Sequence, residues 1–156
     1  MKEIKLTRGQ VTLVDDEDFE YLNQFNFHAK PGQNTYYAIC KIKANGKYLN
    51  KRLHRLIMNP PDNMEVDHID RDGLNNQKSN LRICTHQQNQ MNCLKQKNTT
   101  SKYKGVHFNG KNYHSYIKIN QKRIHIGYYD REIDAAKAYD KKAKELYKEY
   151  SNINIK

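Results

Sequence analysis

The sequence is poor in hydrophobic residues and has no long hydrophobic run. Only 37% of its 156 residues are hydrophobic and the mean hydropathy is -1.08, which predicts a thin core for one ordinary domain or two very small ones. No apolar stretch approaches the roughly 20 residues that span a bilayer, and the N-terminal MKEIKLTRGQ has no apolar signal region. These absences predict a cytoplasmic protein without a membrane partner. Its 12 tyrosines supply aromatic rings that can pack in the core.

Cysteine is also scarce. The three cysteines, Cys40, Cys84 and Cys93, are odd in number, lie far apart and form no CxxC pair. This spacing argues against a disulfide framework and against a zinc ribbon. We therefore interpret them as small buried thiols.

Acidic residues are missing from a long central stretch of this basic chain, whose formal net charge is +11. Residues 73–129 contain no Asp or Glu. They carry Lys78, Arg82, Lys95, Lys97, Lys102, Lys104, Lys111, Lys118, Lys122 and Arg123. A surface of this kind binds polyanions through phosphate contacts and counterion release, although charge alone distinguishes neither DNA from RNA nor binding from simple solubility. Interleaved His, Tyr and Asn, which can touch bases, favour a nucleic acid partner.

Hydrophobic periodicity and turn residues predict short strands and helices along the chain. Extended structure is expected at 4–14, 35–54, 64–70, 80–84, 103–109, 112–120 and 122–129, and helices at 15–25, 54–58, 85–92 and 130–150. Asn45-Gly46 is a strong turn signal within 35–54. The polar segment 94–101 predicts a linker between a region at 1–93 and a region at 102–156.

The Asp67-His68 pair lies in a segment crowded with Asn and Gln. Phosphodiester hydrolysis needs a base for water and stabilisation of the departing oxygen, and a histidine titrates near neutrality. On a strand, Asp67 would point away from His68, where its carboxylate suits a hard cation such as Mg²⁺. The amides add further oxygens without charge that repels DNA.

The motif DHIDRDGLNNQKSNLRICTHQQNQMN (67–92) resembles the HNH, or ββα-metal, nucleases, especially the homing-type branch of phages and mobile introns. The resemblance implies a β-hairpin and a helix that clasp one Mg²⁺ or Mn²⁺ per active site. Asp67 would be a metal ligand and His68 the general base. Asn80 would brace the loop that aims His68, and Asn89 would be the second ligand in place of the final His of the family name.

The roles of several residues near this motif have two interpretations. His86 lies one turn before Asn89 on the same helical face and is the alternative ligand. Asp70 is expected in an exposed loop, with metal binding as the less favoured reading. Arg55 and Arg82 either contact DNA phosphates or have structural roles.

The second region is predicted to present a basic sheet face to DNA. Alternation places Val106, Phe108, Ile117, Ile119, Ile124 and Ile126 toward a core. The expected DNA-binding residues are Lys104, His107, Asn109, His114, Tyr116, Lys118, Arg123 and His125. A face of this composition can enter a major groove, where Arg reads guanine and Asn reads adenine.

Residues 101–154 resemble the AP2 domain through SKYKGV, YHSYIKI, KRIHIGYYD, DAAKAYDKKAKELY and the closing SNIN. The resemblance implies a DNA-binding sheet of three strands covered by one helix. The family has Trp where Tyr113 stands and usually more arginines on the sheet. The resemblance therefore does not indicate which bases the sheet would contact.

These features predict an α+β protein with a ββα-metal (HNH) nuclease domain and a β-rich N-terminal extension at 1–93, followed by a small AP2-like domain at 102–156. The expected function is metal-dependent cleavage of double-stranded DNA by a phage or mobile-element homing-type endonuclease, in the cytoplasm of a bacterium or a phage-infected cell, with no protein partner required. The alternative is a sequence-specific DNA-binding regulator with an inactive nuclease scaffold. The basic residues Lys41, Lys43, Lys47, Lys51 and Arg52 either hold DNA beside the cut or complete the first core.

Overall fold

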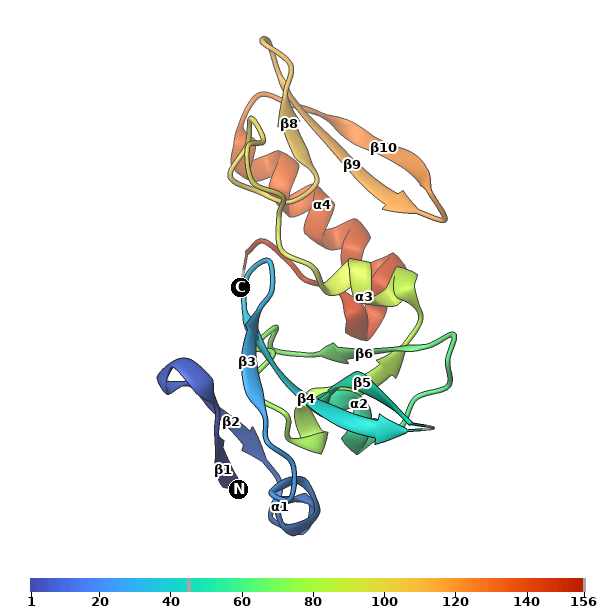
Figure 1. Cartoon of the computed structure of the whole chain (residues 1–156). Helices are drawn as coiled ribbons and strands as arrows, with labels where there is room; N and C mark the ends of the chain where they lie inside the picture. The colour runs from blue at the N-terminus through green and yellow to red at the C-terminus, as the bar shows by residue number, and fades with distance from the viewer. Residues whose placement is uncertain (45, 156) are drawn as a thin grey trace. The chain divides into compact units, whose positions relative to one another are not determined.

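The structure, a computed structural model, describes residues 1–44 and 46–155. The chain divides into two compact units, Met1–Thr85 and His86–Lys156. The predicted mixture of α and β elements is confirmed (Figure 1). Asn45 of the predicted turn lies outside the described residues, whereas Gly46 has a positive φ of 74°.

The first unit is built from small antiparallel sheets and two short helices. It contains β1 (Lys2–Lys5), β2 (Val11–Val14), β3 (His28–Pro31), β4 (Tyr36–Ala44), β5 (Lys47–Arg52), β6 (Glu65–His68), β7 (Leu81–Cys84), α1 (Asp16–Leu22), α2 (Leu53–Met58) and the 3-10 turns Thr7–Gly9 and Lys78–Asn80. Strand β1 pairs with β2, β3 and β5 flank β4, and β6 pairs with β7. Alternation along these strands sends one set of side chains into a shared core. That core contains Ile4, Val14, Leu22, Phe27, Ala38, Cys40 and Leu53.

Helix α2 ends where the sequence predicts. Asn59 follows it in the left-handed conformation, with φ of 41°, and its N–H bonds to the carbonyl of Arg55. Pro60 cannot continue the helical hydrogen bonding, so the chain turns toward β6.

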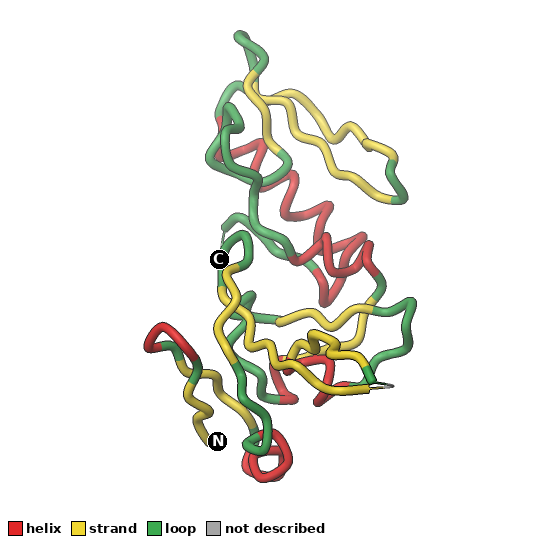
Figure 2. The backbone as a smooth tube through the Cα atoms, in the orientation of Figure 1, coloured by secondary structure: helices red, strands yellow, loops and turns green. Residues whose placement is uncertain are grey.

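The second unit contains a three-stranded antiparallel sheet and a long helix. Its elements are α3 (His86–Asn92), β8 (Val106–Phe108), β9 (Tyr113–Ile119), β10 (Lys122–Tyr129), α4 (Glu132–Tyr147) and the 3-10 turn Lys148–Tyr150. The strand order is β10-β9-β8, and α4 packs on one face (Figure 2). The buried contacts are made by Val106, Ile117, Ala135, Ala136, Tyr139, Ala143 and Tyr147.

Two predictions of burial need correction. Cys93 is exposed because it follows the end of α3 and its carbonyl binds surface side chains, while Cys40 and Cys84 are buried as expected. Phe108 and Ile124 are each 36% exposed. The single helix α4 covers only part of the apolar face, so residues at its margins stay in contact with solvent.

The division between the units falls after Thr85, at the step from β7 to α3. Helix α3 packs within the second unit: Met91 contacts its core, and Lys104 Nζ donates to the carbonyls of Met91 and Cys93 at 2.8 and 2.6 Å. A buried carboxylate, Asp140, binds the backbone N–H groups of Asn154 and Ile155 at 2.8 and 2.9 Å. The predicted linker at 94–101 and the domain limits at 93 and 102 stay predictions.

Candidate active site

The β6-β7 hairpin carries the Asp-His pair. Its register sets Asp67 opposite Arg82 and His68 opposite Leu81. Asp67 and His68 are each only 5% exposed. Adjacent residues on a strand point to opposite faces, so the two side chains have separate surroundings and can have separate tasks.

His68 is held by a buried amide. His68 Nε2 lies 3.1 Å from Asn76 Oδ1, and Asn76 is 1% exposed. Asn76 Nδ2 donates to the carbonyl of Gly73 at 3.2 Å, which fixes the amide orientation because a carbonyl only accepts. Asn76 Oδ1 therefore faces the ring and accepts from Nε2–H. The neutral ring then has its lone pair on Nδ1, the nitrogen that can accept a proton from water.

The first strands of the chain hold Asn76 in place. Asn76 Nδ2 also donates to Thr12 Oγ1 at 2.7 Å, and that hydroxyl donates to the carbonyl of Leu74 at 2.7 Å. The backbone of Leu13 exchanges hydrogen bonds with Leu74 and Asn76, each at 2.8 Å. Asn76 and Thr12 were missed by reasoning from the sequence, because their contact joins segments 64 residues apart. The only local signal is the second Asn of a pair beside a Gly-Leu turn.

Gly73 allows this loop to approach the neighbouring sheet. A Cβ at Gly73 would lie 2.5 Å from the carbonyl oxygen of Tyr36 and 2.7 Å from the ring of Tyr37. Its N–H bonds to Thr35 Oγ1 at 3.0 Å. Any larger residue would push the loop that carries Asn76 away from the hairpin.

Asn80 binds the other side of the same loop. Its Nδ2 donates to Asp70 Oδ1 at 2.9 Å and to the carbonyl of Asn75 at 2.8 Å, and its Oδ1 accepts from the N–H of Asp70 at 3.0 Å. These are the contacts of a residue that braces the loop; its part in catalysis stays a prediction. Asp70 is exposed, as expected. Burial alone would raise the pKa of Asp70, but hydrogen bonds from Asp72 N–H, Asn75 and Asn80 outweigh it and lower that pKa.

A second buried histidine lies against His68. The ring centroids of His54 and His68 are 4.9 Å apart in an edge-to-face arrangement, and the ring of Tyr37 is 6.0 Å from His68. Burial lowers the pKa of His54 to about 3, and the neighbouring charges of His68, Arg52 and Arg55 act in the same direction. Burial also lowers the pKa of His68. The hydrogen bond to Asn76 and the nearby carboxylates raise this pKa, but they only partly offset the effect of burial. His68 is therefore neutral near pH 7 and able to act as a base.

Asp67 is paired with Arg82. Arg82 Nε and Nη2 donate to the same carboxylate oxygen, Oδ2, at 2.9 and 2.6 Å. In the described part of the chain, no cluster of three or more His, Cys, Asp or Glu side chains could hold a metal ion. Mg²⁺, however, is usually held by one or two carboxylates together with waters and substrate phosphates. The oxygen chemistry of Asp67 therefore fits a hard divalent ion.

The predicted second ligand lies in the other unit. Asn89 and its alternative His86 are both on α3, three residues apart and so about one helical turn from each other. Asn89 is half-buried and His86 is exposed. The assignment of either to a metal stays a prediction.

Three of the basic residues predicted to bind DNA contact protein groups. Arg82 binds Asp67, Arg55 Nη1 donates to the carbonyl of Met64 at 3.0 Å, and Lys104 binds the carbonyls that follow α3. Each of these bonds stabilises the local fold. Their contact with DNA stays a prediction.

Six other predicted residues share one face of the second unit's sheet. The registers of β8, β9 and β10 align His107, His114, Tyr116, Lys118, Arg123 and His125. His114 Nε2 lies 2.6 Å from His125 Nδ1, and the Arg123 guanidinium lies 5.0 Å from the centre of the Tyr116 ring. Asn109 belongs instead to the turn before β9, where its Oδ1 accepts from the N–H groups of Lys111 and Asn112 at 3.0 and 2.8 Å.

Comparisons with known proteins place these residues in context. Residues 51–91, which include Asp67, His68, Asn80 and Asn89, match a family described as HNH endonuclease. The chain is 30% identical over 151 residues to an uncharacterized HNH endonuclease of Acanthamoeba polyphaga mimivirus, across 94% of this chain and 76% of that relative. No solved structure gives a significant match. None of the helices in the described ranges is long and apolar enough to cross a membrane.

Proposed function

The chain belongs to the HNH endonuclease family and is a nuclease, and from that premise we propose that it cleaves double-stranded DNA by metal-dependent hydrolysis, as a homing-type enzyme of a phage or mobile element. The observation that carries the chemical proposal is the buried hydrogen bond of 3.1 Å between His68 Nε2 and Asn76 Oδ1. This bond keeps the proton on Nε2, which makes Nδ1 the basic nitrogen of the neutral ring.

His68 acts as the general base. Its Nδ1 takes a proton from water while the water oxygen attacks phosphorus and the bond from phosphorus to the 3′ oxygen breaks. The departing 3′ oxygen takes a proton from solvent water, so the products carry 5′-phosphate and 3′-hydroxyl ends. Asn76 does not touch the reacting atoms and is a positioning residue, because it fixes the tautomer and the direction of the imidazole.

Asp67 would hold the divalent ion, Mg²⁺ or Mn²⁺, that HNH nucleases generally use. When bound, the ion supplies electrostatic stabilisation of the negative charge on phosphate and leaving oxygen. The motif assigns Asn89 as the second oxygen ligand and Asn80 as the residue that braces the loop. Arg82 would hold the Asp67 carboxylate in position, since it binds one carboxylate oxygen from the neighbouring strand.

The second unit would bind the duplex as an AP2-like module. The support is one sheet face with aligned His, Tyr, Lys and Arg side chains and no acidic residue between 73 and 129. Exposed cations on such a face attract phosphates, and Arg123 is available to base edges.

A plasmid assay tests the enzymatic proposal. Supercoiled DNA is incubated with the full chain and Mg²⁺, Mn²⁺ or EDTA, and the ends are mapped. We expect relaxed or linear DNA with either metal and none with EDTA. Asn89→Ala should raise the metal concentration needed for half-maximal cleavage, whereas His86→Ala should not. Intact plasmid under all conditions, combined with tight duplex binding, would favour the DNA-binding regulator instead.

A further inference from the structure

The β3-β4-β5 sheet of the first unit has two unlike faces. Ala38 and Cys40 of β4 point into the core, and Ile42 packs against it. The alternate residues of β4 point the other way. There, Lys41 is paired with Asn50 and Lys43 with Tyr48 on β5, and Tyr37 is paired with Lys30 on β3.

Ile39 on this second face is buried, but the residues around it are basic and open to solvent. The face presents Lys30, Lys41, Lys43, Tyr48, Asn50 and Arg52, all exposed, and we call these six residues the basic face. Tyr48 is 70% exposed. Residues 21–61 contain no Asp or Glu at all. Within the described ranges, no carboxylate forms an ion pair with the four cations of this face. Their charge is therefore available to an external anion.

The basic face is continuous with the site of chemistry. The Arg52 guanidinium lies over the Tyr37 ring, 5.0 Å from its centre, and the Tyr37 ring is 6.0 Å from that of His68. The face thus begins beside the general base. From there it follows β4 through Lys41 and Lys43, which are spaced by roughly 7 Å along the strand.

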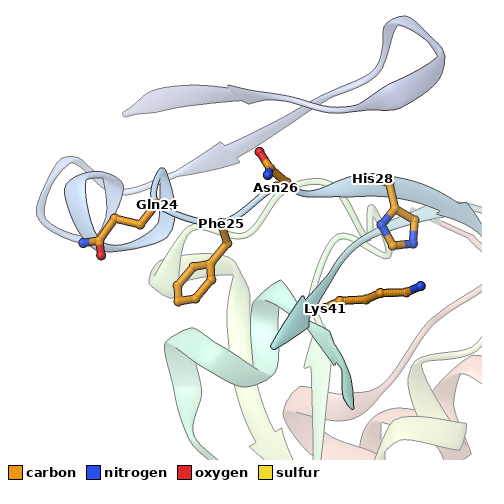
Figure 3. Close-up of a pocket in the computed structure, with 5 residues that line it drawn as sticks. All are labelled: Gln24, Phe25, Asn26, His28 and Lys41. Atoms are coloured by element: carbon orange, nitrogen blue, oxygen red, sulfur yellow. The ribbon is translucent and has the colours of Figure 1, made fainter. Parts of the chain in front are cut away.

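A pocket adjoins this face. Its volume is about 540 Å³, and it is lined by Gln24, Phe25, Asn26, His28 and Lys41 (Figure 3). His28 and Lys41 come from neighbouring strands, and the amides come from the segment between α1 and β3. The lining offers a cation, an imidazole and two amides but no carboxylate, which suits a phosphate with its attached sugar.

We propose that the basic face binds the phosphate backbone of the DNA duplex next to the cleaved bond. The inference rests on the proposed nuclease function and adds a second binding surface, in the unit that carries His68. Charge complementarity and continuity with His68 select DNA as the occupant. Contacts to phosphates position a duplex without reading its bases, so this surface would set register and affinity whatever the sequence.

The β4-β5 hairpin supplies a matched control for this proposal. Lys47 and Lys51 belong to the same β5 strand and are exposed, but their pairing with Ala44 and Cys40 places them on the opposite side of the sheet. The test variant is Lys41→Gln/Lys43→Gln and the control is Lys47→Gln/Lys51→Gln. Both remove two charges from one hairpin, so a general loss of positive charge affects them equally.

Duplex affinity of the full chain is measured against salt concentration, together with single-turnover cleavage. We expect the test variant to bind roughly 10-fold more weakly and the slope of log affinity against log salt to fall by about 2, one per lost phosphate contact. The control should match the wild type in both. Cleavage at saturating protein should be unchanged in the control variant, and Lys41→Arg/Lys43→Arg, which keeps both charges, should bind as tightly as the wild type.

Three results would overturn the inference: equal losses in the two double variants, an unchanged salt slope in the test variant, or stronger competition by duplex RNA than by duplex DNA. Binding is measured without metal and does not require cleavage. Intact plasmid would contradict the nuclease proposal, whereas the binding results alone decide whether the basic face contacts DNA, so the two failures are distinguishable.

Discussion

His68 and Asn76 are almost completely removed from solvent, whereas His114 and His125 on the sheet of the second unit lie among exposed and half-buried residues. In the first unit the polar atoms of the Asn76 amide have directed partners: the ring of His68, Thr12 Oγ1 and the carbonyl of Gly73. In the second unit the two histidines contact one another and the ring of Tyr128, whose centroid is 4.9 Å from each; His114 stacks on that ring and His125 is tilted against it. The difference teaches that proton transfer needs one fixed orientation, while phosphate binding needs accessible charge that adapts to its ligand.

The largest effect expected from this comparison is that of His68→Ala. Loss of a general base lowers the rate by about 10³-fold, while exposed binding residues stay in place. Single-turnover cleavage should therefore fall and duplex affinity should stay within about twofold. A variant that cuts at the wild-type rate would remove His68 from the mechanism.

Asn76→Ala should come next. The ring loses the acceptor that fixes its tautomer, so cleavage should fall by roughly 10- to 100-fold. Ser79→Ala, an exposed change in the same loop, is the control. Because Asn76 acts through His68, the Asn76 change should have no further effect on the rate in a His68→Ala background. Additive losses in the double variant would show that Asn76 acts on the reaction by another route.

Loss of the Asn76 side chain should also lower stability. Its buried partners, including Thr12 and the carbonyl of Gly73, would lose a donor, at a cost of roughly 1–3 kcal/mol. Urea unfolding of Asn76→Ala measures this cost. Thr12→Val should show a smaller loss of both stability and cleavage, since the bond between Asn76 and His68 is retained.

The buried His54 predicts that the stability of the fold depends on pH. The unfolded chain takes up this proton near pH 6.5, but the folded chain does so only near the depressed pKa of about 3. The unfolded state thus binds more protons across that window, and stability falls as the pH drops below 6.5. From pH 6.5 to pH 5 the loss from His54 approaches about 2 kcal/mol.

Urea unfolding at several pH values checks this expectation. His54→Phe keeps a ring against His68 but cannot titrate, so its stability should depend less steeply on pH. Ser79→Ala, an exposed change that removes no titratable group, should leave the dependence of the wild type. An equally steep curve for His54→Phe would mean that other groups carry the effect.

The smallest effect is expected at the second unit. Arg123→Gln should weaken duplex binding by roughly 5- to 10-fold and reduce the salt slope by about 1, because one phosphate or base contact is lost. The rate at saturating protein should not change. A loss of rate without a loss of affinity would reverse the division of tasks between the two units.

The sequence predicted most of the elements, because their signals are local. Pro60 ends α2, the turn residue Gly46 joins β4 to β5, and alternation gives the three strands before α4. The prediction that the protein is an endonuclease is confirmed at the level of the family. Burial was predicted less well, since the exposure of Phe108 depends on how far α4 reaches across the sheet.

The contacts around His68 did not follow from the sequence, because they also depend on how distant elements pack. The motif contains several Asn residues of similar spacing, and only the fold decides that Asn76 reaches the ring while Asn80 binds Asp70. His54 was assigned to the start of a helix, but its closeness to His68 depends on the packing of α2 against β6. Such contacts are set by tertiary packing and leave no periodic pattern.

The hydroxyl of Thr12 has a practical consequence for anyone who trims this protein. A fragment cut to the matched region, 51–91, would keep His68 and Asn76 but lose strand β2, whose Thr12 holds Asn76 in place. Such a minimal peptide should be a poor catalyst even if it folds. The smallest useful nuclease therefore starts upstream of residue 12, and a small molecule that separated β2 from Asn76 would lower activity without touching His68 itself.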